Sequence, residues 1–306
     1  MGVSWVAGSV RSRSLAHRRL GRTGARAVAS SPSLDLALRQ LAQSPYAHDV
    51  RPGQRLAEAQ EAVLATVLWH LRIIAGWLPR SGAEMARVLA GYWEIANVAL
   101  LLGSMEGANV GTPFDLGTLG TVWNRARVAR TPDEVRATLA ASPWGDPGTN
   151  VPATLVVWLR MRWAERVAQI VPGAYDWGAG LLAFFVAREV FAAGRRPGPR
   201  AWPTAPLGSG WQDATTITDF AMRLPRGARW ALEGIQDPTD LWRAEARWWT
   251  RVEADALAML ARFQPGGREA VVASAALLLA DAWRTRAALE IADRAGLPLE
   301  AFDELA

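Results

Sequence analysis

Two amino acids are missing from this chain of 306 residues: it contains no cysteine, and every one of its 34 Lys-or-Arg positions is arginine. The absence of cysteine excludes disulfides, iron–sulfur clusters, thiolate zinc sites and cysteine nucleophiles. The absence of lysine excludes the phosphate-binding lysine of the P-loop, the kinase strand lysine and any lysine Schiff base. Several large classes of enzyme are therefore excluded.

Strand signals and long apolar runs are also scarce. No segment shows a clear alternation of Val, Ile and Thr, and no Asn-Gly hairpin turn occurs. The longest strongly apolar stretch, 270–283, is interrupted by Ser274 and ended by Asp281, which makes it shorter than the roughly 20 residues that cross a bilayer. We expect no transmembrane helix. The N-terminal charges follow the short apolar part, the reverse of a secretory signal.

The charge balance argues only weakly for a nucleic-acid partner. The net charge is +5, and the isoelectric point of 10.7 follows from the very high pKa of arginine. The early arginines could contact phosphates, but acidic residues are nearly as numerous over the whole chain. We expect no nucleic-acid partner.

Helix signals run through the whole sequence. Apolar residues recur at steps of three or four residues in 56–78, 92–107, 155–170 and 249–263. With strand signals nearly absent, this periodicity predicts an all-α fold.

One helical unit is predicted to occur three times, because three segments begin alike with Ser, Thr or Asp followed by Pro: 31–41, 131–141 and 237–247. Thr131 and Glu134 form a capping box in sequence. The elements Ser44-Pro45-Tyr46 and Ser142-Pro143-Trp144 end the first two short helices. We predict a first repeat at 1–112, a second at 113–196, an exposed linker rich in Pro and Gly at 197–219, and a third repeat at 220–306.

No residue pattern indicates catalysis, a metal or a cofactor. His17, His48 and His70 lie on separate segments without an acidic ligand at metal spacing, so we expect surface or capping roles. The stretch 178–183 (GAGLLA) matches a dinucleotide-binding fingerprint literally, but it follows a turn rather than a strand. We expect no cofactor, no metal and no small-molecule substrate, and hence not an enzyme.

The helix at 92–107 carries two polar side chains in its apolar stripe, Glu94 and Asn97. Residues three apart share a helix face, and burying both groups without partners would cost a few kcal/mol. Two interpretations stay open. Either they bond neighbouring helices of the first repeat, or they line a solvated or partner-filled socket.

The chain resembles the central-stalk connector family of the V-type and A-type rotary ATPases. The similar segments are 8–21 (GSVRSRSLAHRRLG), 33–47 (SLDLALRQLAQSPYA), 92–102 (YWEIANVALLL), 116–146 and 277–305. In 92–102, Glu94 and Asn97 match the acid and the amide of the family's aromatic-acid-x-x-Asn helix. Near the C-terminus the family repeats this pair, whereas here the corresponding stretch offers Ala282 and Thr285.

The resemblance implies three similar helical units around a pseudo-threefold axis, forming a funnel with a central socket. It implies a non-catalytic rotor subunit that couples the central shaft to the proteolipid ring, with those two as partners. It would lie peripherally on the cytoplasmic face of the plasma membrane. The residues expected to meet the partners are Arg11, Arg13, Arg19, Glu94 and Asn97. The alternative is a helical adaptor or scaffold outside any ATPase.

Overall fold

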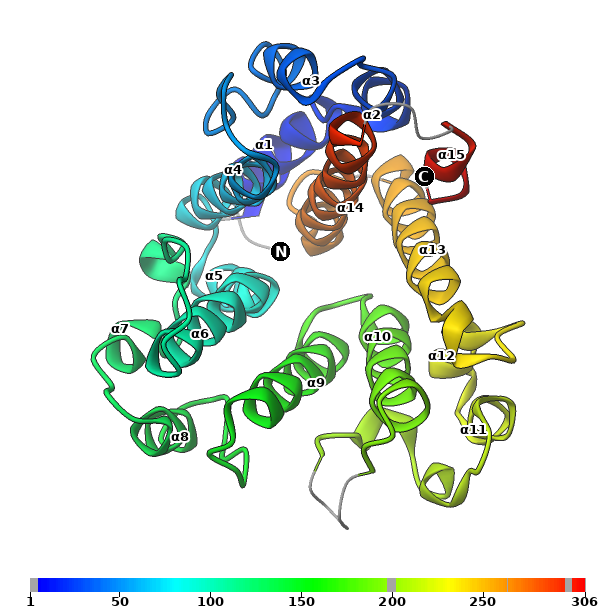
Figure 1. Ribbon diagram of the computed structural model, residues 1–306. Coiled ribbons are helices and arrows are strands. Elements are labelled where there is room, and N and C mark those ends of the chain that lie inside the picture. Colours follow the sequence, from blue (N-terminus) through cyan, green and yellow to red (C-terminus); the bar gives the residue numbers. More distant parts are fainter. Residues whose placement is uncertain (1–4, 197–201, 263, 295–298, 306) are drawn as a thin grey trace. The chain divides into compact units, whose positions relative to one another are not determined.

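A computed structural model describes residues 5–196, 202–262, 264–294 and 299–305. These residues form helices and connecting turns, and no strand occurs among them (Figure 1). The predicted all-α fold is confirmed.

The chain divides into two compact units. Compact unit 1 comprises 1–82 and 249–306, and compact unit 2 comprises 83–248. This division by compactness cuts across the first and third predicted repeats. Because similarity between segments is a different property from compactness, the repeat boundaries remain a prediction. Two helices contain residues of both units, α5 (Arg80–Leu89) and α13 (Leu241–Ala261).

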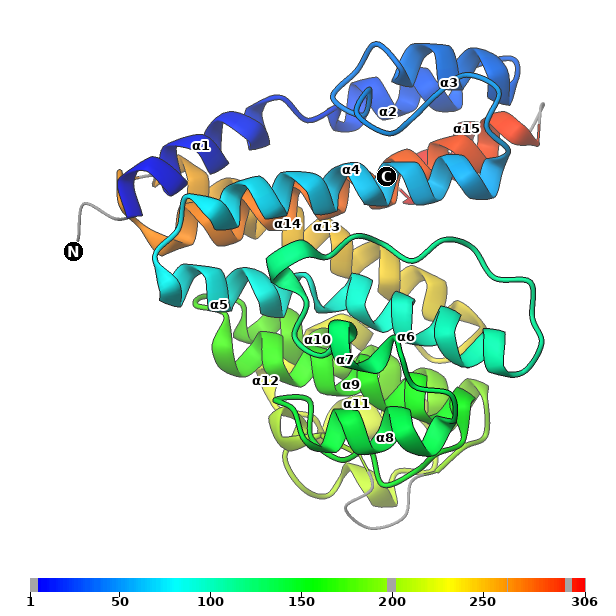
Figure 2. The same cartoon turned by 90° about the vertical axis from the view of Figure 1, so that its left-hand side faces the viewer.

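Compact unit 1 is built around one long, mostly buried helix, α14. Helices α1, α2 and α4 pack against it (Figures 1 and 2). The buried positions of α14 are mainly Ala, Val and Leu, whose small and medium side chains allow several helices to approach one axis. The helices that lie wholly in this unit are α1 (Val6–His17), α2 (Gly21–Ala29), α3 (Leu34–Leu41), α4 (Leu56–Gly76), α14 (Arg268–Asp293) and α15 (Leu299–Leu305).

In compact unit 2, buried apolar side chains gather around α10 and also between α6, α8 and α9, and α9 packs closely on α10. A Cβ at Gly178 would lie 2.4 Å from the Ala168 nitrogen and 2.6 Å from the Ala164 oxygen, so only glycine permits this approach. The α-helices wholly in this unit are α6 (Gly91–Met105), α7 (Trp123–Ala126), α8 (Pro132–Ala140), α9 (Pro152–Ile170), α10 (Tyr175–Ala187), α11 (Ile217–Arg223) and α12 (Arg226–Arg229). Single turns at Gly117–Leu119, Arg188–Ala192, Ala205–Leu207, Trp211–Asp213, Trp230–Leu232 and Pro238–Asp240 complete it.

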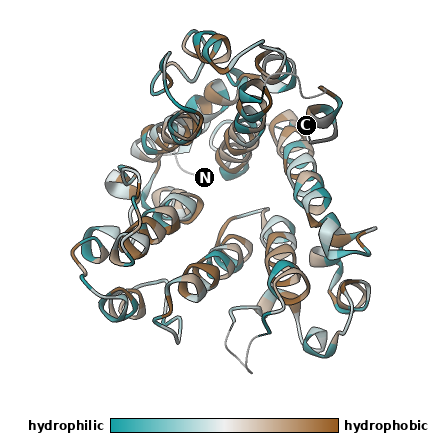
Figure 3. Cartoon of the chain, in the orientation of Figure 1, coloured by the Kyte–Doolittle hydropathy of each residue, from teal (hydrophilic) through white to brown (hydrophobic). Residues whose placement is uncertain are grey.

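The four periodic segments are helices α4, α6, α9 and α13, as their spacing predicts. Each long helix carries both hydrophobic and hydrophilic residues along its length (Figure 3). The fingerprint-like stretch 178–183 lies inside α10, which agrees with its rejection as a dinucleotide site.

The predicted helix starts are partly corrected. Thr131 caps α8 by accepting from the Glu134 N–H, but the Glu134 carboxylate accepts from Arg130 rather than from Thr131. For α3 the cap is Ser33, two residues after the predicted Ser31, because the helix begins only at Leu34.

The third predicted start is not equivalent to the first two. Asp237 caps only the turn Pro238–Asp240, directly before the long helix α13. In the first two repeats the capped helix is short and lies more than ten residues before the long helix. Thr216 fits that order, since it caps the short helix α11 by accepting from the Asp219 N–H.

The stretch predicted as an exposed linker combines exposed residues with buried apolar side chains where it is described. Leu207, Trp211 and Ile217 are at most 4% exposed and belong to the core around α10. The Pro and Gly content correctly predicts an irregular backbone. It does not predict that these three apolar side chains are buried. Residues 197–201 lie outside the described residues.

Within the described residues, no single helix is long and apolar enough to cross a bilayer. One bent pair, α5 with α6 at 49°, meets the same test of length and composition when its two helices are counted together.

Candidate functional site

Glu94 lies in the middle of α6 and is only 2% exposed. One carboxylate oxygen accepts three backbone N–H groups, from Thr121 and Val122 at 2.7 Å and from Trp123 at 2.8 Å. The other accepts the indole N–H of Trp144 at 2.8 Å. We call these five residues the Glu94 cluster. It fixes the start of α7 and the turn after α8 onto α6.

Asn97 is fully buried one turn further along α6. Its amide nitrogen donates to the Phe114 carbonyl at 2.9 Å, and its amide oxygen accepts the Phe114 N–H at 2.7 Å. Both backbone groups of one residue are therefore satisfied by one side chain. The structure shows internal hydrogen bonds for both Glu94 and Asn97, but their partners lie in the second predicted repeat rather than within the first. Both side chains are buried in this structure, and their contact with a partner remains a prediction.

A second buried carboxylate performs the same task in compact unit 1. Asp281, in the middle of α14, is 1% exposed and accepts the N–H groups of Leu20 at 3.0 Å and Gly21 at 2.7 Å. The phenol of Tyr46 donates to it at 2.9 Å. We call these four residues the Asp281 cluster. It fixes the start of α2 and the turn after α3 onto α14.

The aromatic residues of the two clusters come from the same local structure. Ser44 donates to the Leu41 carbonyl at 2.7 Å and accepts the Tyr46 N–H at 3.2 Å. Ser142 donates to the Leu139 carbonyl at 2.7 Å, and Trp144 donates its backbone N–H to Ser142 at 3.1 Å. Each Ser-Pro-aromatic element thus turns the chain by the same pair of bonds and directs its aromatic side chain to the buried acid.

Electrostatics at the Asp281 cluster follow from burial. Burial raises the pKa of Asp281, and the donors from Gly21, Tyr46 and Leu20 oppose that rise. Burial also raises the pKa of Tyr46 well above its usual value, and the neighbouring Asp281 carboxylate adds to this effect.

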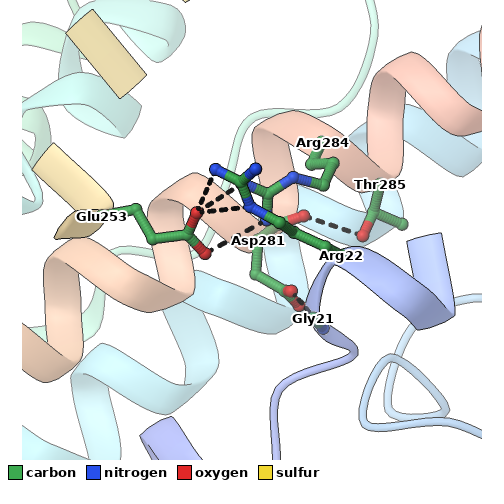
Figure 4. A network of polar contacts seen from close by, with 6 residues as sticks. All are labelled: Gly21, Arg22, Glu253, Asp281, Arg284 and Thr285. Carbon is green, nitrogen blue, oxygen red and sulfur yellow. Dashed lines mark hydrogen bonds and ion pairs between the residues drawn. The ribbon is translucent and has the colours of Figure 1, made fainter. Parts of the chain in front are cut away.

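An ion-pair network lies beside Asp281 (Figure 4). Glu253 on α13 accepts from Arg284 of α14 at 2.8 Å and from Arg22 of α2 at 3.1 Å. Burial is the largest single influence on Glu253 and favours its neutral form, but the two guanidinium groups hold its pKa below the ordinary value. Arg284 is 1% exposed, so the pair is a buried one. Thr285 is also buried, and it donates to the Asp281 carbonyl within the helix.

Asp281 is the site residue that the sequence reasoning missed. In the resemblance stated above, the acid position at the C-terminus falls on Ala282, which directly follows Asp281. A signal exists in the sequence, because Asp281 is a lone acid ending an apolar run, as Glu94 is a lone acid within one. A buried carboxylate among apolar helix residues needs hydrogen-bond donors, whichever position of a family it is aligned with.

The three predicted arginines lie on compact unit 1. Arg11, on α1, places its guanidinium 3.7 Å from the ring centre of Trp77, and both side chains are exposed. Arg13 is exposed on the same helix. Arg19, after the end of α1, is half-buried and donates to the Ala16 carbonyl at 2.8 Å. Contact of these arginines with a partner remains a prediction.

His48 and His70, which lie on separate segments of the sequence, both lie against the ring of Trp69. His17 is exposed, and His48 pairs with Asp49 at 2.7 Å while stacking on Trp69. His70 is half-buried, and burial together with the nearby His48 lowers its pKa to about 4. Across the described ranges, no group of three or more His, Asp or Glu side chains is arranged to hold a metal ion.

A surface pocket of about 390 Å³ lies in compact unit 2, between the turn after Trp144 and the indoles of Trp158 and Trp202. Its acidic group, Asp146, is bound by Arg136 at 2.8 Å and accepts the Gly148 N–H. Those bonds lower the pKa of Asp146 to about 2. The carboxylate is thus engaged in holding its own loop.

No protein-family model matches the chain, and no curated protein matches it.

Proposed function

We propose that this protein is a non-catalytic rotor subunit of a V/A-type ATPase, which couples the central shaft to the proteolipid ring in the membrane. In this proposal its three helical repeats surround a pseudo-threefold axis as a funnel, and the central socket receives the shaft. It lies on the cytoplasmic face of the plasma membrane. It has no catalytic residue, metal or cofactor, because its task is to transmit torque.

The observation that carries the proposal is the order in which the two acid clusters join the repeats. Glu94 belongs to the first repeat and binds the start of the second, at 121–123. Asp281 belongs to the third repeat and binds the start of the first, at Leu20 and Gly21. Glu94 also binds Trp144 of the second repeat, and Asp281 also binds Tyr46 of the first. In a cyclic arrangement of three repeats, the third repeat has to contact the first.

Glu189 is the corresponding acid of the second repeat. The three acids, Glu94, Glu189 and Asp281, lie 13 or 14 residues after the first residues of α5, α10 and α14. Glu189 is 7% exposed, lies in the π-helical turn Arg188–Ala192 and pairs with Arg195. Its position supports a threefold use of one unit.

Co-purification tests the proposal. The tagged chain is extracted from its native membranes in mild detergent, and the bound proteins are identified by mass spectrometry. We expect the shaft subunits, the nucleotide-binding subunits and the proteolipid to be recovered with it. Assembly of the complete ATPase without this chain would contradict the proposal. Recovery with other proteins only, while the ATPase assembles, would favour the helical adaptor instead.

A further inference from the structure

The pattern of α1 is the reverse of an ordinary surface helix. Its buried positions are Gly8, Ser9, Ser12 and Ala16, whereas Val6 and Val10 are 40% and 48% exposed. Gly8 permits close packing, because a Cβ there would lie 2.5 Å from the side chain of Leu78 and 3.1 Å from the Trp77 carbonyl oxygen. Small residues therefore form the inner face, while Val6 and Val10 lie outside it and Leu15 is half-buried.

The buried serines are satisfied within compact unit 1. Ser9 donates to the Val6 carbonyl and accepts the Gly266 N–H at 2.9 Å, and Ser12 donates to the Gly8 carbonyl at 2.7 Å. Both buried serine hydroxyls of the inward face of α1 are therefore hydrogen-bonded. Val6 and Val10 nevertheless leave nearly half of their side chains exposed to solvent.

A third exposed apolar group lies beside this face. Trp77, directly after α4, is 46% exposed, and Arg11 of α1 stacks on its ring. Arginine and tryptophan both combine an apolar body with a polar end, and both are common where water meets apolar groups. Apolar side chains that gather on a surface mark an interaction site.

The same face is strongly positive. Residues 1–34 contain six arginines and no acidic residue. Arg22 and Arg26 pair with Glu253 and Asp303. Arg11 on α1 and Arg18 directly after it carry exposed positive charge. Arg268 and the exposed acid Glu269 are the first two residues of α14. The Arg268 guanidinium lies over the ring of Trp5.

We propose that the outer face of α1, together with Trp77, binds the surface of an anionic phospholipid bilayer. Guanidinium groups bind lipid phosphates, while aliphatic and indole side chains enter the headgroup region. An acidic protein segment would use the arginines but would leave the exposed Val6 and Val10 unexplained. This inference does not depend on the proposed rotor function, since it rests on one face of compact unit 1.

Vesicle flotation of the purified full chain tests it. We expect binding to vesicles that mix phosphatidylcholine with phosphatidylglycerol, weakened by salt, and much less binding to phosphatidylcholine alone. Because each arginine near an anionic surface contributes about 1 kcal/mol, the double variant Arg11→Gln/Arg18→Gln should bind about thirtyfold more weakly. Val6→Ser/Val10→Ser should also weaken binding, and at any salt concentration, because it removes the apolar part.

The matched controls lie in compact unit 2. Val128 is 69% exposed and Arg160 is exposed on α9, so Val128→Ser and Arg160→Gln remove one group of each kind elsewhere. They should leave flotation unchanged. Equal binding to both vesicle types, no binding, or equal losses in the controls would overturn the proposal. Retention on immobilised polyglutamate without vesicle binding would overturn it in favour of an acidic protein partner.

Discussion

At the scale of single residues, two buried carboxylates hold the starts of helices. Glu94 and Asp281 each accept backbone N–H groups at the beginning of a segment, where helices leave such donors without partners inside the helix. A negative charge is favourable at that end of a helix. Each acid thereby compensates for its own burial and also satisfies donors that would otherwise be buried and unpaired.

Replacing Glu94 by Ala should be strongly destabilising. Three backbone donors and the Trp144 indole lose their acceptor, and we expect the free energy of unfolding to fall by about 3–5 kcal/mol. Urea denaturation followed by circular dichroism measures this. Glu106 lies exposed at the end of the same helix, and Glu106→Ala should stay within about 0.5 kcal/mol of the unchanged chain. Similar losses for both variants would show that the buried hydrogen bonds of Glu94 contribute no more to stability than an exposed glutamate does.

Stability should depend on pH through His70. Its pKa in the folded chain is about 4, below the value of 6.5 in an unfolded chain, so the unfolded state binds more protons between these values. This contribution to stability is complete above pH 6.5 and is lost as the pH falls toward 4. In His70→Gln, the free energy of unfolding should therefore fall less as the pH is lowered from 6.5 to about 4. His17→Gln controls for the loss of an exposed histidine, and an unchanged slope in His70→Gln would refute the assignment.

At the scale of helices, the sequence predicts the elements well because their apolar periodicity is local information. The segments around Leu56, Gly91 and Pro152 all fold as expected. The capped starts are harder to predict, since Ser31 and Ser33 both offer a hydroxyl and only the path of the chain selects Ser33. The burial of Leu207 and Trp211 within the predicted linker depends on contacts that no local pattern contains.

The contact between α9 and α10 depends on a single glycine. An alanine at Gly178 would place its Cβ 2.4 Å from the backbone of α9, so the helices must move apart. We expect Gly178→Ala to cost about 1–3 kcal/mol or more in thermal or urea unfolding. Gly76, at the end of α4, has no neighbouring atom within 4 Å of that position, and Gly76→Ala should be neutral or stabilising by up to about 1 kcal/mol. The reverse ranking would contradict this explanation of the packing.

The candidate site is only half predictable. Glu94 and Asn97 attract attention because they interrupt an apolar stripe, but sequence alone cannot choose between an internal and an external partner. The structure supplies Phe114 and residues 121–123, which lie 17 to 29 positions away. The partners of Asp281 are more than 230 positions away, so no local pattern identifies them.

At the scale of the whole molecule, the proposal depends on a hollow formed by three repeats of one helical unit. In the proposed arrangement, the contact of Asp281 with the start of α2 joins the third predicted repeat to the first, which an open row of three repeats would leave apart. A socket of this kind needs no reacting group. It needs walls that hold their positions under load, and buried ion pairs such as that of Glu253 with Arg284 fix helices against each other.

Small-angle X-ray scattering of the purified chain measures the hollow most directly. A filled globule of this length has a radius of gyration of roughly 19 Å. The proposed funnel places its mass away from the centre, so we predict a clearly larger radius at concentrations where the protein is monomeric. A value at the compact limit would contradict a socket able to receive a shaft.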